Sequence, residues 1–156
     1  MPQPKISVTE ILFYHLQRQP LEQVLPELLE KCVERRWRVV VRVGSEARRD
    51  ALDAHLWTYR DDSFLPHGTV KDGRPDAQPI WVTADADNPN DATVLFLADG
   101  AEAADTSAYQ RVVQIFDGND PDAVDRARAA WAEAKAAGHD ATYWQQAESG
   151  RWERKA

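Results

Sequence analysis

Residues 38–56, RVVVRVGSEARRDALDAHL, contain the pattern that decides the fold. The valine-rich run Arg38–Val43 favours a buried strand, because branched side chains pack well on a pleated surface. Gly44 and Ser45 predict a turn, and Ser45 is suited to cap the start of a helix over Glu46–Leu56. That helix is expected to turn four side chains toward the core: Ala47, Ala51, Leu52 and Leu56. A strand that leads directly into a helix is the repeating unit of an α/β domain.

The preceding residues show the same alternation. Val8–His15, VTEILFYH, is rich in β-branched and aromatic residues and predicts a first strand. From Leu21 to Val33 the apolar residues recur at helical spacing, which predicts a helix. Pro26 interrupts this spacing, so either the regular helix begins near Val24 or its first turns are bent.

The later residues continue the alternation. A surface connection rich in glycine and proline, Asp61–Gln78, precedes three further expected strands: Pro79–Val82, Thr93–Ala98 and Arg111–Phe116. Asp120 and Pro121 are suited to cap and open a long helix that Gly138 closes. This order of elements predicts a three-layer α/β fold with a mostly parallel central sheet.

The length and charge of the chain limit its organisation and its partners. At 156 residues it suits one domain, 1–156, in which residues 142–156 are expected to form a short aromatic and basic appendix. The net charge of −7 disfavours direct contact with nucleic acid, whose phosphates repel an acidic protein. Stacking of single strands on tryptophan or tyrosine would also require a basic groove beside the rings.

The cysteine content and the hydropathy indicate the compartment. The lone cysteine, Cys32, excludes an internal disulfide and suits a reducing cytoplasm. No apolar run approaches the ~20 residues that span a bilayer, so neither membrane insertion nor export is expected.

The motifs of nucleotide-binding and hydrolytic α/β proteins are missing. The first strand–helix junction, His15–Leu21, has no glycine that could cradle a phosphate. The acidic loop Asp85–Asp91 lacks the glycine and the glutamate that a calcium loop needs. The four histidines and the single cysteine have no zinc-binding spacing. We therefore expect no cofactor, no metal and no catalytic residue.

His67 leaves one alternative open. A histidine in a loop next to large apolar residues can act as a general acid or base. On this hypothesis the chain is a small α/β enzyme acting on a phosphorylated or nucleotide substrate. It predicts a polar pocket around His67.

Large apolar residues gather after the second helix: Trp57, Tyr59, Phe64, Leu65 and Pro66. Such side chains either fold back over the sheet or form a rigid patch that binds a partner. The composition alone leaves both interpretations open.

Three segments occur in order at characteristic spacings: TEILFY at 9–14, LDAHLW at 52–57 and SFLPHG at 63–68. In this combination the chain resembles the chi subunit of bacterial DNA polymerase III. The resemblance implies a Rossmann-like fold and a clamp-loader accessory subunit without catalytic activity. It also implies an interface with the psi subunit of the clamp loader, built from Trp57, Phe64, Leu65, Pro66 and His67.

The second partner that the resemblance implies is the acidic, phenylalanine-terminated C-terminal tail of single-stranded DNA-binding protein. Such a tail needs an apolar cleft and nearby cations. The expected tail site comprises Phe116, Val124, Arg128, Trp131 and Lys135, of which the last helix contributes all but the first. Val124 and Ala132 occupy positions where the family has lysines. Candidate substitutes for these cations are Arg126, Lys135, Arg151, Arg154 and Lys155.

Overall fold

The computed structural model of the chain describes residues 9–60, 64–103 and 105–156. Within these ranges the chain forms strands and helices that alternate for most of its length. In chain order the elements are β1 (Glu10–Leu16), α1 (Leu21–Glu34), β2 (Val39–Arg42), α2 (Glu46–Thr58), the 3₁₀ helix η1 (Pro75–Ala77), β3 (Ile80–Thr83), β4 (Val94–Leu97), β5 (Arg111–Asp117), α3 (Pro121–Ala136), β6 (Asp140–Gln146) and β7 (Trp152–Arg154).

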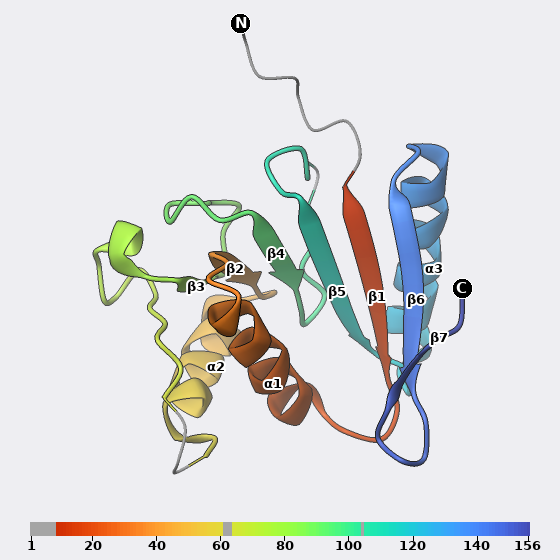
Figure 1. Ribbon diagram of the computed structural model, residues 1–156, viewed down its shortest axis with the longest axis horizontal. Helices are drawn as coiled ribbons and strands as arrows, with labels where there is room; N and C mark the ends of the chain where they lie inside the picture. Colours follow the sequence, from red (N-terminus) through yellow and green to blue (C-terminus); the bar gives the residue numbers. More distant parts are fainter. Residues whose placement is uncertain (1–8, 61–63, 104) are drawn as a thin grey trace, which may run out of the picture.

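The strands form a single sheet in the order β3-β2-β4-β5-β1-β6-β7. All neighbouring pairs are parallel except β6 and β7, which form an antiparallel hairpin. Figure 1 shows α1 and α2 on one face of the sheet and α3 on the other. The structure confirms the expected three-layer, Rossmann-like α/β fold with a mostly parallel sheet.

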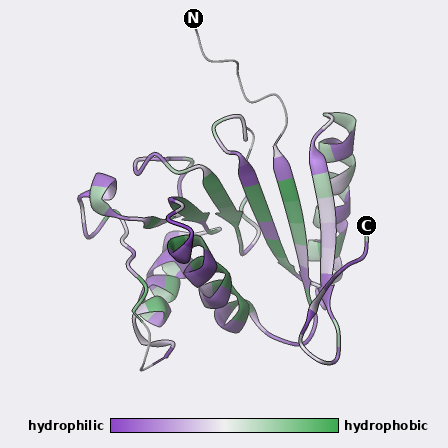
Figure 2. Ribbon diagram, viewed as in Figure 1, coloured by the Kyte–Doolittle hydropathy of each residue, from purple (hydrophilic) through white to green (hydrophobic). Residues whose placement is uncertain are grey.

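The central strands are buried on both faces, as a parallel sheet between helical layers requires. In β2, Val39 and Val41 contribute to the core under α1 and α2, whereas Val40 contributes to the core on the side of α3. All three valines are fully buried. Figure 2 shows hydrophobic residues concentrated along the middle of β4, β5 and β1. Burial of apolar surface on both faces therefore holds the three layers together.

Both predicted helix caps form. The Ser45 hydroxyl accepts a hydrogen bond from the main-chain N–H of Arg48 at 3.2 Å, at the start of α2. The Asp120 carboxylate accepts one from the main-chain N–H of Asp122 at 3.0 Å, and Pro121 is the first residue of α3. Each cap satisfies a backbone donor that a helix start leaves free.

The inner face of α2 differs from the prediction. Leu52 and Leu56 are buried as expected, but Ala47 and Ala51 are exposed. Arg49 is buried in their place, with 6% of its surface exposed. The prediction for the two alanines was wrong because the methylene stem of an arginine can pack inward while small alanines remain at the surface.

α1 contains Pro26 in its interior, yet the helix does not begin after Leu21 on that account. The helix begins at Leu21, and Pro26 is buried inside it. Because proline has no N–H, the carbonyl of Glu22, four residues earlier, loses its usual helical partner. The His55 Nε2 atom of α2 lies 2.6 Å from that carbonyl oxygen and donates a hydrogen bond to it. The neighbouring helix thus satisfies the group that the proline leaves unpaired.

The largest departure from the expected order of elements follows α3. Gly138, at a φ of 79°, lies just beyond the helix in the left-handed conformation that glycine adopts readily. The chain then returns as β6, parallel to β1, and folds back as β7. Residues 142–156, which were expected to form an appendix, contribute most of β6 and all of β7 to the sheet.

Candidate binding surfaces

Five ring side chains meet between α3 and the sheet, and we term them the α3 aromatic cluster: Phe13, His15, Phe116, Trp131 and Tyr143. They come from β1, β5, α3 and β6. Trp131 contacts Phe13 and Tyr143 edge-on, with ring centroids 5.5 and 6.1 Å apart. Phe116 contacts His15 and Tyr143 at 5.2 and 6.0 Å. Edge-to-face contacts of this kind fix the rings in one arrangement.

His15 is held in this cluster by two neighbours. Its Nδ1 atom lies 2.5 Å from the Tyr143 hydroxyl. A Cβ atom at Gly118 would lie 1.9 Å from His15 Nε2, so only glycine lets the turn after β5 pass the ring. The main-chain N–H of Gly118 also donates to the carbonyl of Leu16 at 2.6 Å. The turn and the ring therefore fix each other's position.

Two cations border the cluster on α3. The Lys135 ammonium lies 4.9 Å from the centroid of the Trp131 ring, within cation–π range. Burial lowers the pKa of His15, which Asp117 opposes and Arg128 reinforces, and burial raises the pKa of Tyr143, which the positive charge of Arg128 opposes. The exposed Arg128 therefore acts electrostatically on two members of the cluster.

The five residues that the sequence predicted for a tail site lie in one region. Phe116 and Trp131 belong to the cluster, and Arg128 and Lys135 border it. Val124 is partly buried one turn before Arg128 and packs on the same core. The four residues of α3 are therefore compatible with one continuous binding surface, which we term the Arg128 surface, whereas Phe116 is buried beneath the helix with 8% of its surface exposed.

Three members of the cluster were not predicted: Phe13, His15 and Tyr143. The alternation of side chains along a strand places Phe13 and His15 on the same face, so the sequence did hold a signal for these two. Tyr143 had no such signal, because its place depends on the pairing of β6 with β1.

The opposite flank of α3 borders an open groove of about 1330 Å³. Arg126 and Glu133 line this groove from α3, and Phe116 lines it from β5. Arg128 and Trp131 do not line it. The two flanks of α3 thus present different surfaces, with Arg126 on one and Arg128 on the other.

A second candidate surface lies at the end of α2. Trp57 and Phe64 are 48% and 73% exposed, and their ring centroids are 5.9 Å apart. The two rings do not fold back over the sheet, which was one of the two interpretations that the sequence left open, but form an exposed pair. Pro66 is partly buried, and Ser63 of the SFLPHG segment lies outside the described residues.

Leu65 and His67, two residues of the predicted psi interface, are interior, with 2% and 3% of their surface exposed. The His67 ring lies under Trp57, with 4.2 Å between centroids. Its Nδ1 and Nε2 atoms lie 2.7 and 3.2 Å from the carbonyl oxygens of Leu65 and Asp53. In the described structure the His67 ring therefore lies beneath Trp57, and its nitrogens face two backbone carbonyls and the Asp53 carboxylate, not an open polar pocket.

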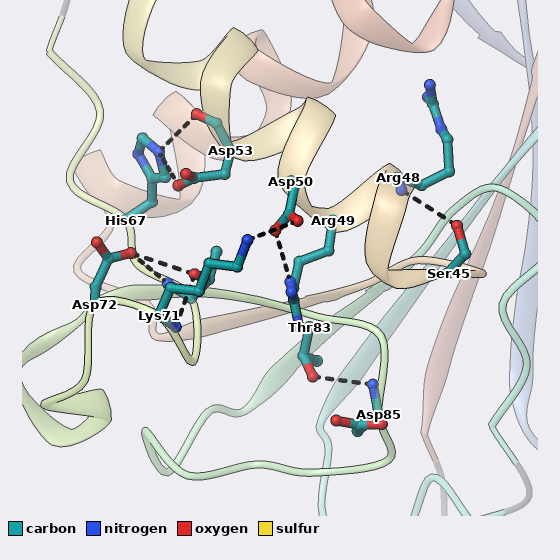
Figure 3. A network of polar contacts seen from close by, with 11 residues as sticks. Ser45, Arg48, Arg49, Asp50, Asp53, His67, Lys71, Asp72, Thr83 and Asp85 are labelled. Carbon is teal, nitrogen blue, oxygen red and sulfur yellow. Dashed lines mark hydrogen bonds and ion pairs between the residues drawn. The ribbon is translucent and has the colours of Figure 1, made fainter.

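Figure 3 shows how polar contacts tie the loop 64–72 to α2. The Lys71 ammonium lies 2.9 Å from the Asp50 carboxylate, and this donor lowers the pKa of Asp50. One turn later, an oxygen of the Asp53 carboxylate lies 3.1 Å from His67 Nε2. Contacts at two successive helical turns thus join α2, which carries Trp57, to the loop that carries Phe64.

The acidic loop between β3 and β4 is fixed by the sheet itself. The Asp87 carboxylate accepts hydrogen bonds from the Thr83 hydroxyl at 2.7 Å and from the Trp81 indole at 3.3 Å. Among the described residues, no group of three or more His, Cys, Asp or Glu side chains is arranged to hold a metal ion. Across those same residues, no helix is both long and apolar enough to cross a membrane.

Comparison with known proteins identifies a family that covers most of the chain. The family model described as "DNA polymerase III chi subunit, HolC" matches residues 8–142. A probable DNA polymerase III subunit chi from Rickettsia prowazekii is 29% identical over 103 residues, which make up 66% of this chain and 62% of that protein. DNA polymerase III subunit chi from Pseudomonas aeruginosa is 34% identical over 50 residues, 32% of this chain and 35% of that protein. The chain thus matches less than two thirds of the length of either relative.

Proposed function

The chain belongs to the DNA polymerase III chi subunit family, and from that premise we propose that it is a non-catalytic accessory subunit of the replicative polymerase. It links the clamp loader, through psi, to the acidic C-terminal tail of single-stranded DNA-binding protein. The observation that carries this proposal is the Arg128 surface, where an aromatic cluster lies beside two cations of α3.

The chemistry of the Arg128 surface suits an acidic peptide that ends in phenylalanine. The terminal ring can pack against Trp131, which is partly exposed at the edge of the α3 aromatic cluster. The carboxylates of the tail can pair with Arg128 and Lys135, which lie on the same flank as Trp131. Val124 adds apolar surface in place of a family lysine, so the attraction rests on fewer cations.

Arg128→Ala is expected to weaken the binding of an acidic, phenylalanine-terminated peptide about tenfold. The reason is that a charge-assisted hydrogen bond contributes roughly 1.5–3 kcal/mol. Isothermal titration calorimetry with a synthetic tail peptide measures the change. Added salt is expected to weaken binding to the unaltered protein as well, because the attraction is largely ionic.

Arg126→Ala is the matched control for this test. Arg126 is also an exposed arginine of α3, but it lies on the flank that borders the groove. We expect it to change the affinity less than about twofold. Unchanged affinity of Arg128→Ala, or an equal loss in both variants, would place the tail elsewhere.

The exposed pair of Trp57 and Phe64 supports the second link, to psi. Large aromatic side chains that are exposed in one subunit often dominate the energy of an interface. Leu65 and His67 are buried beneath the pair and support it, because the His67 ring packs against Trp57 and its Nδ1 atom lies next to the Leu65 carbonyl. Pro66, between them, limits the conformations of the loop.

Trp57→Ala is expected to abolish co-purification with a co-expressed psi subunit, because it removes the larger ring of the pair. Affinity purification followed by size-exclusion chromatography measures the complex. Arg128→Ala is the control, since α3 lies on the other face of the sheet, and it should leave the complex intact. Full recovery of psi with Trp57→Ala would contradict this interface.

The alternative, an enzyme with His67 as its acid or base, has less support. A proton-transfer group must come within hydrogen-bond distance of its substrate. The side chain of His67 is fully buried, and its ring nitrogens lie near the carbonyl groups of Leu65 and Asp53 and near the Asp53 carboxylate, so no face of the ring is open to a substrate. The location of the ring fits a structural role beneath Trp57.

A further inference from the structure

Aromatic rings line the half of the sheet that α1 and α2 leave open. Figure 1 shows no helix of the described chain in front of β1, β6 and β7 on the face that α1 covers elsewhere. Tyr14, Trp144 and Trp152 project onto this face from the three strands, and all are partly exposed. Parallel strands are normally covered on both faces, so an open aromatic face calls for an explanation.

The three rings form one continuous surface, which we term the aromatic platform. Tyr14 and Trp144 are neighbours across β1 and β6, and their rings stack at 6.4 Å with 21° between the planes. Trp152 meets the Tyr14 ring edge-on at 4.8 Å. The Trp144 indole N–H donates to the Thr142 hydroxyl at 2.8 Å, which fixes the orientation of that ring.

An exposed arginine borders the aromatic platform. Arg154 pairs with Trp144 across the β6–β7 hairpin and so lies on the platform face. The nearest acidic residue of β6 on this face, Asp140, lies at the far end of the strand.

We propose that the aromatic platform binds single-stranded nucleic acid. Bases of any sequence can stack on tryptophan and tyrosine rings, while phosphates pair with neighbouring arginines. A duplex does not fit, because its bases are already stacked within the helix. The net charge of −7 disfavours this contact for the molecule as a whole, but strand pairing places Arg154 beside Trp144 on the platform face.

The platform is independent of the proposed links to psi and to the tail. It lies on the opposite face of the sheet from α3 and the Arg128 surface. Trp144 and Trp152 also lie beyond residues 8–142, which the family model matches. The proposal can therefore fail while the proposed adaptor function holds, and the reverse is also true.

Fluorescence anisotropy with labelled oligodeoxythymidine and oligouridine at low salt tests the proposal, with a DNA duplex as a third probe. Trp152→Ala is expected to weaken single-strand binding about fivefold or more, and Trp152→Phe should restore most of it because a ring remains. Arg154→Glu should weaken binding. It should also reduce the slope of log affinity against log salt concentration by about one, the value expected for one lost phosphate contact. Preference for one of the two single strands identifies the natural ligand as DNA or RNA.

Two matched controls use residues away from the platform. Trp57→Ala removes an exposed tryptophan at the end of α2, and Arg126→Glu reverses an exposed arginine of α3. Both should bind like the unaltered protein. If Trp152→Ala does not fold, the binding of Arg154→Glu, a substitution at an exposed position, tests the proposal instead. No binding up to about 100 µM protein, equal binding of the duplex, or binding that Arg154→Glu leaves unchanged would overturn the proposal.

Discussion

Pro26 and His55 show how one residue can compensate for another across two helices. Pro26 leaves the Glu22 carbonyl without a helical donor, and His55 Nε2 donates to it at 2.6 Å. His55→Ala is expected to lower the free energy of unfolding by about 1 kcal/mol, because a partly buried carbonyl loses its partner. Urea denaturation measures this change.

Pro26→Ala provides the control, because alanine returns the N–H that the helix lacks. In that background His55→Ala should cost less than half as much, and a double-mutant cycle measures the difference. If His55→Ala costs the same with proline or alanine at position 26, His55 stabilises the protein through other contacts.

At the scale of elements, the sequence predicted the strands and helices that depend on neighbouring residues in the chain. The valines of β2 and the caps at Ser45 and Asp120 depend on neighbouring residues, and the structure confirms them. β6, with the sequence DATYWQQ over Asp140–Gln146, has few β-branched residues and ends in glutamines. It is a strand because it pairs with β1 on one side and β7 on the other, and no local pattern reveals such pairing.

The same distinction explains how much of the Arg128 surface could be predicted. Arg128, Trp131 and Lys135 share one flank of a helix whose spacing is readable in the sequence. Tyr143 joins them only through long-range strand pairing, and its hydroxyl meets His15 across a separation of 128 residues. Local periodicity therefore indicates the helical side of the surface but not the strands beneath it.

At the scale of the whole molecule, the sheet separates the two proposed links. α3 and the Arg128 surface lie on one face, and α2 with Trp57 lies on the other (Figure 1). An adaptor must hold both partners at once, so binding at one site should not change the affinity of the other site. A rigid, close-packed sheet between the sites suits that requirement.

The independence of the Trp57 site and the Arg128 surface can be measured. Trp57→Ala is expected to change the affinity for the tail peptide less than about twofold, because substitutions at distant sites without shared partners combine additively. The double variant Trp57→Ala/Arg128→Ala should lose the same factor in peptide affinity as Arg128→Ala alone. Calorimetry on the three variants tests this. A fivefold effect of Trp57→Ala on the peptide would show that the sheet couples the two surfaces, so that the protein would act as a switch between its partners and not as a passive link.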